Sequence, residues 1–267
     1  MKIEELLYIA INASLKGGEE ILKVYDSDFS VEKKEDNSPL TLADKNANTA
    51  ICNLLAETKF PILSEEGKTI PYEERSEWAY FWMVDPLDGT KEFIKRNGEF
   101  TVNIALIHKQ RSILGVIYVP VTGMLYFAAE SVGSFKKQMT DYKLKNLKDI
   151  ISRSSKLPLE NSDKNFTVVA SRSHLSQETE DFIVGLKTIH KEVSFISSGS
   201  SIKLCLVAEG SADVYPRFAP TMEWDTAAGQ AICEIAGKKV FDYTTNRSLL
   251  YNKQNLLNNW FIVQSLI

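Results

Sequence analysis

The stretch Trp82-Met83-Val84-Asp85-Pro86-Leu87-Asp88-Gly89-Thr90 says more about this chain than any other. The apolar run over 80–84 is typical of a buried strand, and the proline and glycine that follow predict a turn at its end. This turn presents two carboxylates, Asp85 and Asp88, at the end of a rigid element. Paired carboxylates suit a hard cation such as Mg2+. The alternative is an ordinary turn in which both side chains only accept backbone N–H groups.

Length and composition describe a chain of the globular type. The 267 residues suffice for one large or two modest domains, and 44% hydrophobic and 25% charged residues are ordinary values. The net charge of -4, without a basic run, argues against nucleic acid as a partner. Cys52, Cys205 and Cys233 are far apart and form no CxxC pair, which favours reduced thiols. With no signal peptide and no apolar run of ~20 residues in view, we expect a cytoplasmic protein.

The chain divides into two parts with different patterns. Residues 1–150 combine two long helical patterns with a series of apolar runs, which favours an α+β arrangement of antiparallel strands covered by helices. Residues 151–267 alternate strands and helices, which favours an α/β arrangement. The polar segment 138–164 is interpreted as the connection. The expected helices are 2–26, 42–58, 176–187, 201–209 and 224–236, and the expected strands are 61–63, 80–84, 101–107, 113–119, 124–129, 166–170, 192–196, 212–215 and 260–263.

Further acidic residues lie where the expected secondary structure changes. Glu65 and Glu66 follow the strand at 61–63, and Asp225 opens the helix at 224–236. Taken singly, the Glu pair could be loop surface and Asp225 a first-turn acid of its helix. Together with Asp85 and Asp88 they could converge at one sheet edge, where they could not all stay ionised without a counter-charge. Two divalent ions ~3.5–4 Å apart would supply it, hold a phosphate and activate a water.

Other chemistries fit less well. The three histidines, His108, His174 and His190, are scattered and form no HExxH motif, which argues against a zinc protease. The GxSxG, GxxxxGK[ST] and GxGxxG motifs are absent. The turn Gly199-Ser200-Ser201 opens a helix and is a candidate anion site, although a plain serine cap is the alternative.

Two motifs together resemble a known family. Asp85-Pro86-Leu87-Asp88-Gly89-Thr90, preceded by Glu65-Glu66, and Trp224-Asp225-Thr226-Ala227-Ala228-Gly229 are similar to the signatures of the inositol monophosphatase superfamily of Mg2+-dependent, lithium-sensitive phosphatases. Within it the chain looks most like the bacterial CysQ-type 3'(2'),5'-bisphosphate nucleotidases. This narrower resemblance rests on the segments 37–44, 91–94, 98–105, 170–174, 199–203 and 213–217.

The resemblance implies a layered αβαβα sandwich and removal of the 3'-phosphate from 3'-phosphoadenosine 5'-phosphate, which gives AMP and phosphate. It implies one Mg2+ held by Glu65, Asp85 and the Leu87 carbonyl, and a second held by Asp85, Asp88 and Asp225. It also implies that Asp44 orients the Thr90 hydroxyl toward the attacking water and that the Gly89 and Thr90 N–H groups hold the phosphate. On the nucleotide side it implies Ser171, His174, Ser200 and Lys203.

Two alternatives stay open at this stage. An inositol or sugar monophosphatase of the same superfamily would not need His174 and Lys203, which could instead be a loop histidine and a surface lysine. A non-catalytic metal- or phosphate-sensing module would not need the complete acidic set. The resemblance also leaves open a weak peripheral association with the cytoplasmic face of the inner membrane, although no basic amphipathic helix demands it.

Overall fold

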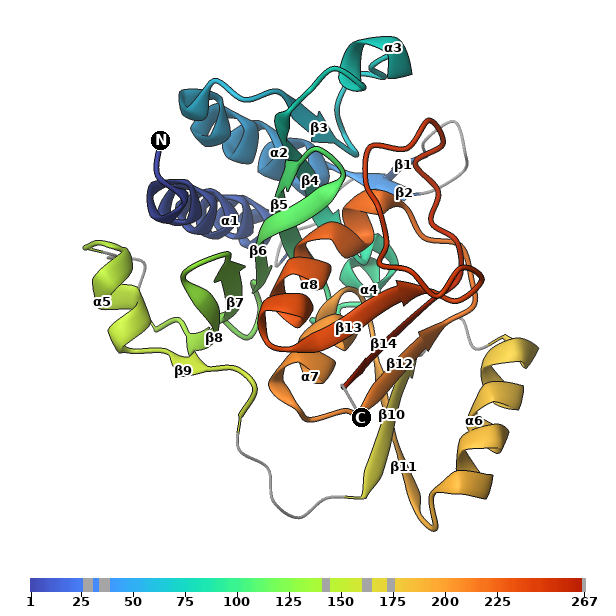
Figure 1. The fold of residues 1–267 in the computed structure, drawn as a ribbon. Helices are drawn as coiled ribbons and strands as arrows, with labels where there is room; N and C mark the ends of the chain where they lie inside the picture. Colours follow the sequence, from blue (N-terminus) through green and yellow to red (C-terminus); the bar gives the residue numbers. More distant parts are fainter. Residues whose placement is uncertain (26–30, 34–38, 141–144, 160–164, 172–175, 266–267) are drawn as a thin grey trace.

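The structure is a computed structural model that describes residues 1–25, 31–33, 39–140, 145–159, 165–171 and 176–265. Its elements form five layers in the order helix, sheet, helix, sheet, helix (Figure 1). The αβαβα sandwich expected from the resemblance is therefore confirmed. Within the described residues, no helix combines the length and the apolar character that crossing a membrane requires.

The first two layers come from the N-terminal part of the chain. Helices α1 (Ile3–Tyr25) and α2 (Leu42–Leu55), with the 3-10 turn η1 (Ala56–Thr58), lie on one face of a seven-stranded sheet. Its strand order is β3-β4-β5-β6-β7-β8-β9, antiparallel except for the β3–β4 pair. The strands are β3 (Ile62–Ser64), β4 (Tyr80–Asp88), β5 (Thr101–His108), β6 (Arg111–Val119), β7 (Met124–Ala129), β8 (Gly133–Gln138) and β9 (Ser155–Lys156).

The third layer is a helix pair, α7 (Ile202–Glu209) and α8 (Glu223–Ile235), between the two sheets. The fourth is a five-stranded sheet in the order β11-β10-β12-β14-β13, and α6 (Gln177–Ile189) covers its outer face. The strands are β10 (Phe166–Ser171), β11 (Val193–Ser198), β12 (Val214–Arg217), β13 (Lys238–Asp242) and β14 (Phe261–Ser265). Pairs among β10, β11 and β12 are parallel, and β14 is antiparallel to its two neighbours.

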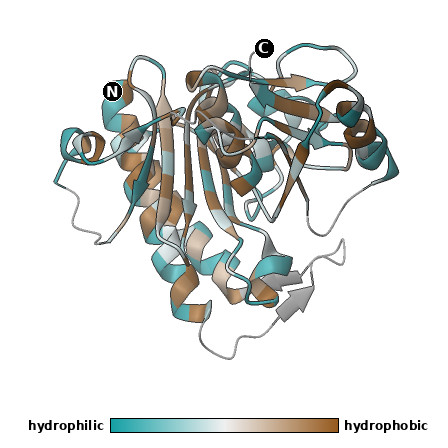
Figure 2. Ribbon diagram, turned by 90° about the horizontal axis from the view of Figure 1, so that it is seen from below, coloured by the Kyte–Doolittle hydropathy of each residue, from teal (hydrophilic) through white to brown (hydrophobic). Residues whose placement is uncertain are grey.

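The core explains the continuous apolar runs of the central strands. On β4, Trp82 and Val84 pack toward α1 and α2, whereas Phe81 and Met83 pack toward α7 and α8. A strand buried on both faces has no need for alternating polar residues. Apolar residues accordingly follow the central strands and the long helices in Figure 2.

The sequence pattern did not reveal several short elements. They are β1 (Val31–Lys33), β2 (Pro39–Thr41), α3 (Tyr72–Arg75), α4 (Thr90–Ile94), β8, α5 (Leu147–Ser152), β9 and β13. All are short or polar, so their apolar period is too brief to register. The segment 138–164, expected as a plain connection, contains α5 and adds β9 to the edge of the larger sheet. The division of the chain at residue 150 stays a prediction.

Candidate active site

Strand β4 does not end at Val84, as the sequence suggested, but continues to Asp88. Asp85 lies opposite Asn103 and Asp88 lies opposite Thr101, so β4 has one residue more than β5 in this interval. The result is a β-bulge, and Pro86 explains its place because proline has no N–H to donate to the ladder. The bulge is stabilised by the Leu87 N–H, which donates to Asp85 Oδ1 at 3.1 Å.

Asp85 is the electrostatic centre of the site. Its side chain is 1% exposed. Burial raises the pKa of Asp85 well above its ordinary value, and the carboxylates of Glu65, Asp88, Asp225 and Asp44 raise it further, in that order. Glu65, Asp88, Asp225 and Asp44 therefore lie within electrostatic reach of Asp85. Their mutual repulsion would be relieved by a bound cation.

Asp225 lies in the first turn of α8, which begins at Glu223. Its Oδ2 accepts the Met222 N–H at 2.9 Å, so it does stabilise the start of its helix. Burial and the nearby Asp88 carboxylate still raise the pKa of Asp225 well above its ordinary value, against the effect of the Met222 N–H. The helix-capping interpretation and the site interpretation thus hold for the same side chain.

Asp88 is held by the turn before α7. Its Oδ2 accepts hydrogen bonds from the Ser200 hydroxyl at 2.6 Å, the Ser201 hydroxyl at 2.6 Å and the Ser201 N–H at 2.7 Å. The Ser201 hydroxyl also lies 2.7 Å from the Asp225 carbonyl oxygen. Ser201 therefore connects the bulge on β4 to the first turn of α8.

The remaining residues expected at the metals and phosphate surround this bulge. The Glu65 N–H donates to the Val84 carbonyl at 3.1 Å, which places the end of β3 beside β4. Asp44, in the first turn of α2, is 2% exposed. Gly89, with φ at 96°, directly precedes α4, and the Thr90 hydroxyl lies 3.5 Å from the Leu87 carbonyl. The first N–H groups of a helix have no partner within it. The expected Asp44–Thr90 pairing stays a prediction.

A cavity of about 130 Å³ adjoins these residues on the side of the second sheet. It is lined by Asp88, Gly89, Glu92, Ser171, Gly199, Ser200, Ser201, Lys203, Leu204, Tyr215, Arg217, Thr221, Asp225, Thr226 and Phe261. Three of the four residues expected on the nucleotide side, Ser171, Ser200 and Lys203, thus line the cavity next to the carboxylates. The fourth, His174, lies outside the described residues.

Lys203 is more deeply buried than a surface lysine. It is 4% exposed, and its ammonium donates to the carbonyl oxygens of Ser198, at 3.3 Å, and Ser200. It also lies 5.5 Å from the centre of the Tyr215 ring. Burial lowers the pKa of Lys203 to about 8, although the Asp88 carboxylate acts in the opposite direction. In this arrangement Lys203 fixes the Gly199–Ser201 turn from within.

Sequence reasoning missed several residues of the site. Thr101 and Asn103 on β5 contact the two serines, Ser201 holds Asp88, and the Glu99 carboxylate accepts the Gly199 N–H at 3.0 Å. A signal did exist, because residues 101 and 103 are polar positions two apart at the start of an otherwise apolar strand. In a strand buried on both faces, such positions indicate a polar partner on one face.

The donor set fits a magnesium site. It consists of carboxylate oxygens and one backbone carbonyl, which are the ligands that this hard cation prefers. In the described ranges, no three His, Cys, Asp or Glu side chains surround a common point at chelating geometry. Asp88 explains part of this, because its Oδ2 is turned into the serine hydroxyls. The fit thus rests on the buried Asp85 and its acidic neighbours.

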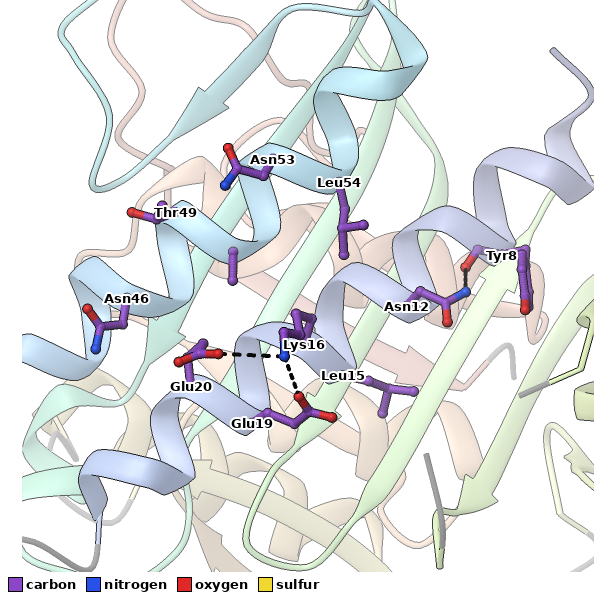
Figure 3. A pocket seen from close by; sticks show the side chains of 11 residues that line it. Tyr8, Asn12, Leu15, Lys16, Glu19, Glu20, Asn46, Thr49, Asn53 and Leu54 are labelled. Atoms are coloured by element: carbon purple, nitrogen blue, oxygen red, sulfur yellow. Dashed lines mark hydrogen bonds and ion pairs between the residues drawn. The ribbon is translucent and has the colours of Figure 1, made fainter. Parts of the chain in front are cut away.

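A larger cavity, of about 890 Å³, lies in the outer groove between α1 and α2 and shares no lining residue with the cavity beside the carboxylates. Its charged residues are already paired, because Lys16 contacts Glu19 at 2.7 Å and Glu20 at 3.7 Å (Figure 3). The amide of Asn12 donates to the Tyr8 carbonyl of its own helix. Size alone therefore does not identify the active site in this molecule.

Comparison with known proteins agrees with the geometry. A family model described as the inositol monophosphatase family matches residues 2–266. The 3'(2'),5'-bisphosphate nucleotidase CysQ of Salmonella typhimurium is 44% identical over 98% of both chains, and that of Escherichia coli K12 is 43% identical over the same share. The crystal structure of CysQ from Bacteroides thetaiotaomicron superposes with a TM-score of 0.91 at 53% identity, covering 98% of this chain and 97% of the other.

Proposed function

The chain belongs to the inositol monophosphatase family, and on this premise we propose that it is a 3'(2'),5'-bisphosphate nucleotidase. Its substrate is 3'-phosphoadenosine 5'-phosphate, and the products are AMP and phosphate. The observation that carries the proposal is the full-length similarity to nucleotidases that bear this name, at 43–44% identity. The acidic cluster at the β4 bulge, beside a cavity lined by Ser171 and Lys203, is the matching chemistry.

Members of the family are metal-dependent, and we assign Mg2+ here from the donor set. Glu65, Asp85 and the Leu87 carbonyl would hold one ion, and Asp85, Asp88 and Asp225 would hold a second. Bound Mg2+ would stabilise charge on the phosphate and lower the pKa of a water molecule. The high pKa that burial and neighbouring carboxylates give Asp85 supports this assignment, because the charged form needs a cation nearby.

The residues of the chain bind and orient the reactants. The Gly89 and Thr90 N–H groups, at the start of α4, would hold the 3'-phosphate. The Thr90 hydroxyl, oriented by Asp44, would help to activate the attacking water: Oγ1 would take a proton from the water as its own hydroxyl proton passes to the Asp44 carboxylate. The water oxygen would bond to phosphorus, the bond from phosphorus to the 3'-oxygen would break, and that oxygen would take up a proton from a solvent water. Ser171, His174, Ser200 and Lys203 would line the nucleotide side of the site. Lys203 would pair with the 5'-phosphate, and His174 would stack on the base or hydrogen-bond to it.

Several further points complete the proposal. The residues that bind the metals and the 3'-phosphate come from positions 1–150 apart from Asp225, and those for the nucleotide come from 151–267. We expect the protein to work in the cytoplasm, where its free cysteines, Cys52, Cys205 and Cys233, would stay reduced. Association with the inner membrane surface and inhibition by Li+ stay predictions.

Phosphate release with Mg2+ tests the proposal. The substrates are 3'-phosphoadenosine 5'-phosphate, inositol 1-phosphate and fructose 1,6-bisphosphate, each with and without Li+. We expect the nucleotide to be hydrolysed with the highest kcat/KM and the reaction to be inhibited by Li+. Preference for either of the other substrates would favour the monophosphatase alternative, and no turnover of any of them would favour a sensing module.

A further inference from the structure

Two buried polar residues on β5 have no part in the function proposed above. Thr101 is fully buried and Asn103 is 1% exposed, in a strand whose other buried residues are apolar. Burying a hydroxyl or an amide costs free energy unless it is hydrogen-bonded. Their position is informative, because they lie directly opposite Asp88 and Asp85 on β4.

Both side chains are engaged with the turn that holds Asp88. Asn103 Nδ2 donates to Ser201 Oγ at 2.9 Å and lies 3.5 Å from Asp88 Oδ2. Thr101 Oγ1 donates to Asn103 Oδ1 at 2.8 Å and lies 2.7 Å from Ser200 Oγ. Thr101 and Asn103 therefore fix the positions of the Ser200 and Ser201 hydroxyls.

The turn itself adopts a conformation that needs such support. Ser200 has φ at 51°, in the left-handed region that side chains other than glycine rarely adopt. A Cβ atom at Gly199 would lie 2.8 Å from the Glu92 Cγ and 2.9 Å from the Glu99 carbonyl oxygen. A strained backbone conformation such as that of Ser200 persists where surrounding contacts hold it in place.

The contacts have a consequence for Asp88. All hydrogen bonds that the Asp88 side chain accepts from the described residues go to Oδ2, and three of them are no longer than 2.7 Å. This fixes the rotation of the carboxylate and leaves Oδ1 without a donor among those residues. Partners that orient a ligating carboxylate typically change metal affinity about 10–100-fold when they are removed.

We propose that Thr101 and Asn103 are positioning residues of the metal site: through Ser200 and Ser201 they fix Asp88 Oδ2, so that Oδ1 is the oxygen available to a cation. The inference rests on the proposed function, since it assumes that Asp88 is a metal ligand. It adds a polar connection from β5, through the turn before α7, to the bulge on β4. Neither residue contacts the substrate in this scheme.

The test compares Asn103→Leu and Thr101→Val, which remove the polar groups but keep the number and branching of the non-hydrogen side-chain atoms. Thr58→Val is the matched control, because Thr58 is also buried and hydrogen-bonded, at 2.8 Å to the Trp82 indole N–H, but lies at η1. The melting temperature is measured as Mg2+ is titrated into chelator-treated protein, which reports metal affinity without turnover. Phosphate release at saturating Mg2+ then gives kcat and KM for the nucleotide.

We expect both β5 variants to need about tenfold more Mg2+ or more for half-maximal stabilisation, with KM nearly unchanged at saturating Mg2+. Thr58→Val should lower the melting temperature without changing the Mg2+ midpoint. An unchanged midpoint in folded Asn103→Leu and Thr101→Val would overturn the inference; if Asn103→Leu does not fold, Thr101→Val decides by the same criterion. A wild type that neither responds to Mg2+ nor hydrolyses the nucleotide would overturn the proposed function instead.

Discussion

The contact between β6 and α8 gives a sharp prediction, because the backbones approach closely at Gly115. A Cβ atom there would lie 2.1 Å from the Ala228 carbonyl oxygen and 2.9 Å from its carbon. Ordinary contacts begin near 3.4 Å, so Gly115→Ala must separate strand and helix by roughly 1 Å or more. The added Cβ atom would clash with backbone atoms of Ala228, so rotating a side chain cannot relieve the clash.

The magnitude follows from this geometry. Overpacking typically costs about 1–3 kcal/mol, and a clash between backbones belongs at the upper end of that range. For a chain of this size, the melting temperature should fall by roughly 4–12 °C. Ala228 lies one turn after Asp225 in α8. Because a misplacement of about 1 Å can cost about 100-fold in rate, kcat should also fall by about that factor.

The assay combines thermal unfolding with phosphate release at saturating Mg2+. Gly185→Ala is the matched control, since Gly185 is exposed on α6 and a Cβ atom there meets nothing within 4 Å. The control should be neutral or more stable by about 0.4–1 kcal/mol, because alanine restricts the unfolded chain. A Gly115→Ala protein that melts at or above the wild-type temperature with full activity would refute the argument.

Three further predictions concern ionised groups. Asp85→Asn should abolish stabilisation by Mg2+ and lower kcat by about 100-fold or more. In the presence of a chelator it should raise the melting temperature, because it removes one of the carboxylates that repel one another. Retained turnover would contradict the metal assignment. Lys203 has a pKa of about 8 in the folded state against 10.5 as its ordinary value, so the neutral form is favoured on folding. The free energy of unfolding of the wild type should therefore rise with pH between these values, by about 2 kcal/mol from pH 7 to 9.5 relative to Lys203→Met. Urea unfolding at several pH values measures both proteins. Equal changes of the unfolding free energy with pH in the two proteins would contradict this prediction. Glu223 is fully buried and accepts hydrogen bonds from the Asn252 N–H at 2.6 Å and from the Lys253 ammonium at 2.6 Å. Glu223→Gln should therefore lower the free energy of unfolding by about 1–3 kcal/mol in the same urea assay. An unchanged free energy would show that these contacts contribute nothing.

The sequence predicted the long elements because their apolar periods are regular. The helix expected at 2–26 is α1, and the strands expected at 113–119 and 124–129 are β6 and β7 within two residues. Convergence of Asp85 and Asp225 could also be expected, since strand ends and helix starts meet at sheet edges. The short β13 was missed, because five residues with two lysines at its start show no period.

What the sequence could not show are contacts between residues far apart in the chain. Asn103 is hydrogen-bonded to Ser201, 98 positions further along the chain, and neither residue type indicates the other as its partner. Lys203 looks like a helix-surface cation in sequence, yet it turns inward to the carbonyl oxygens of its own turn. The bulge at Pro86 likewise depends on pairing with β5, because an isolated proline predicts only an interruption of the strand.

The most direct test of the proposed function follows 3'-phosphoadenosine 5'-phosphate by 31P NMR after the wild-type protein and Mg2+ are added. The account predicts that the 3'-phosphate resonance disappears, inorganic phosphate appears in equal amount, and the 5'-phosphate resonance of AMP remains. Loss of the 5'-phosphate, or an unchanged spectrum while inositol 1-phosphate is hydrolysed under the same conditions, would contradict it.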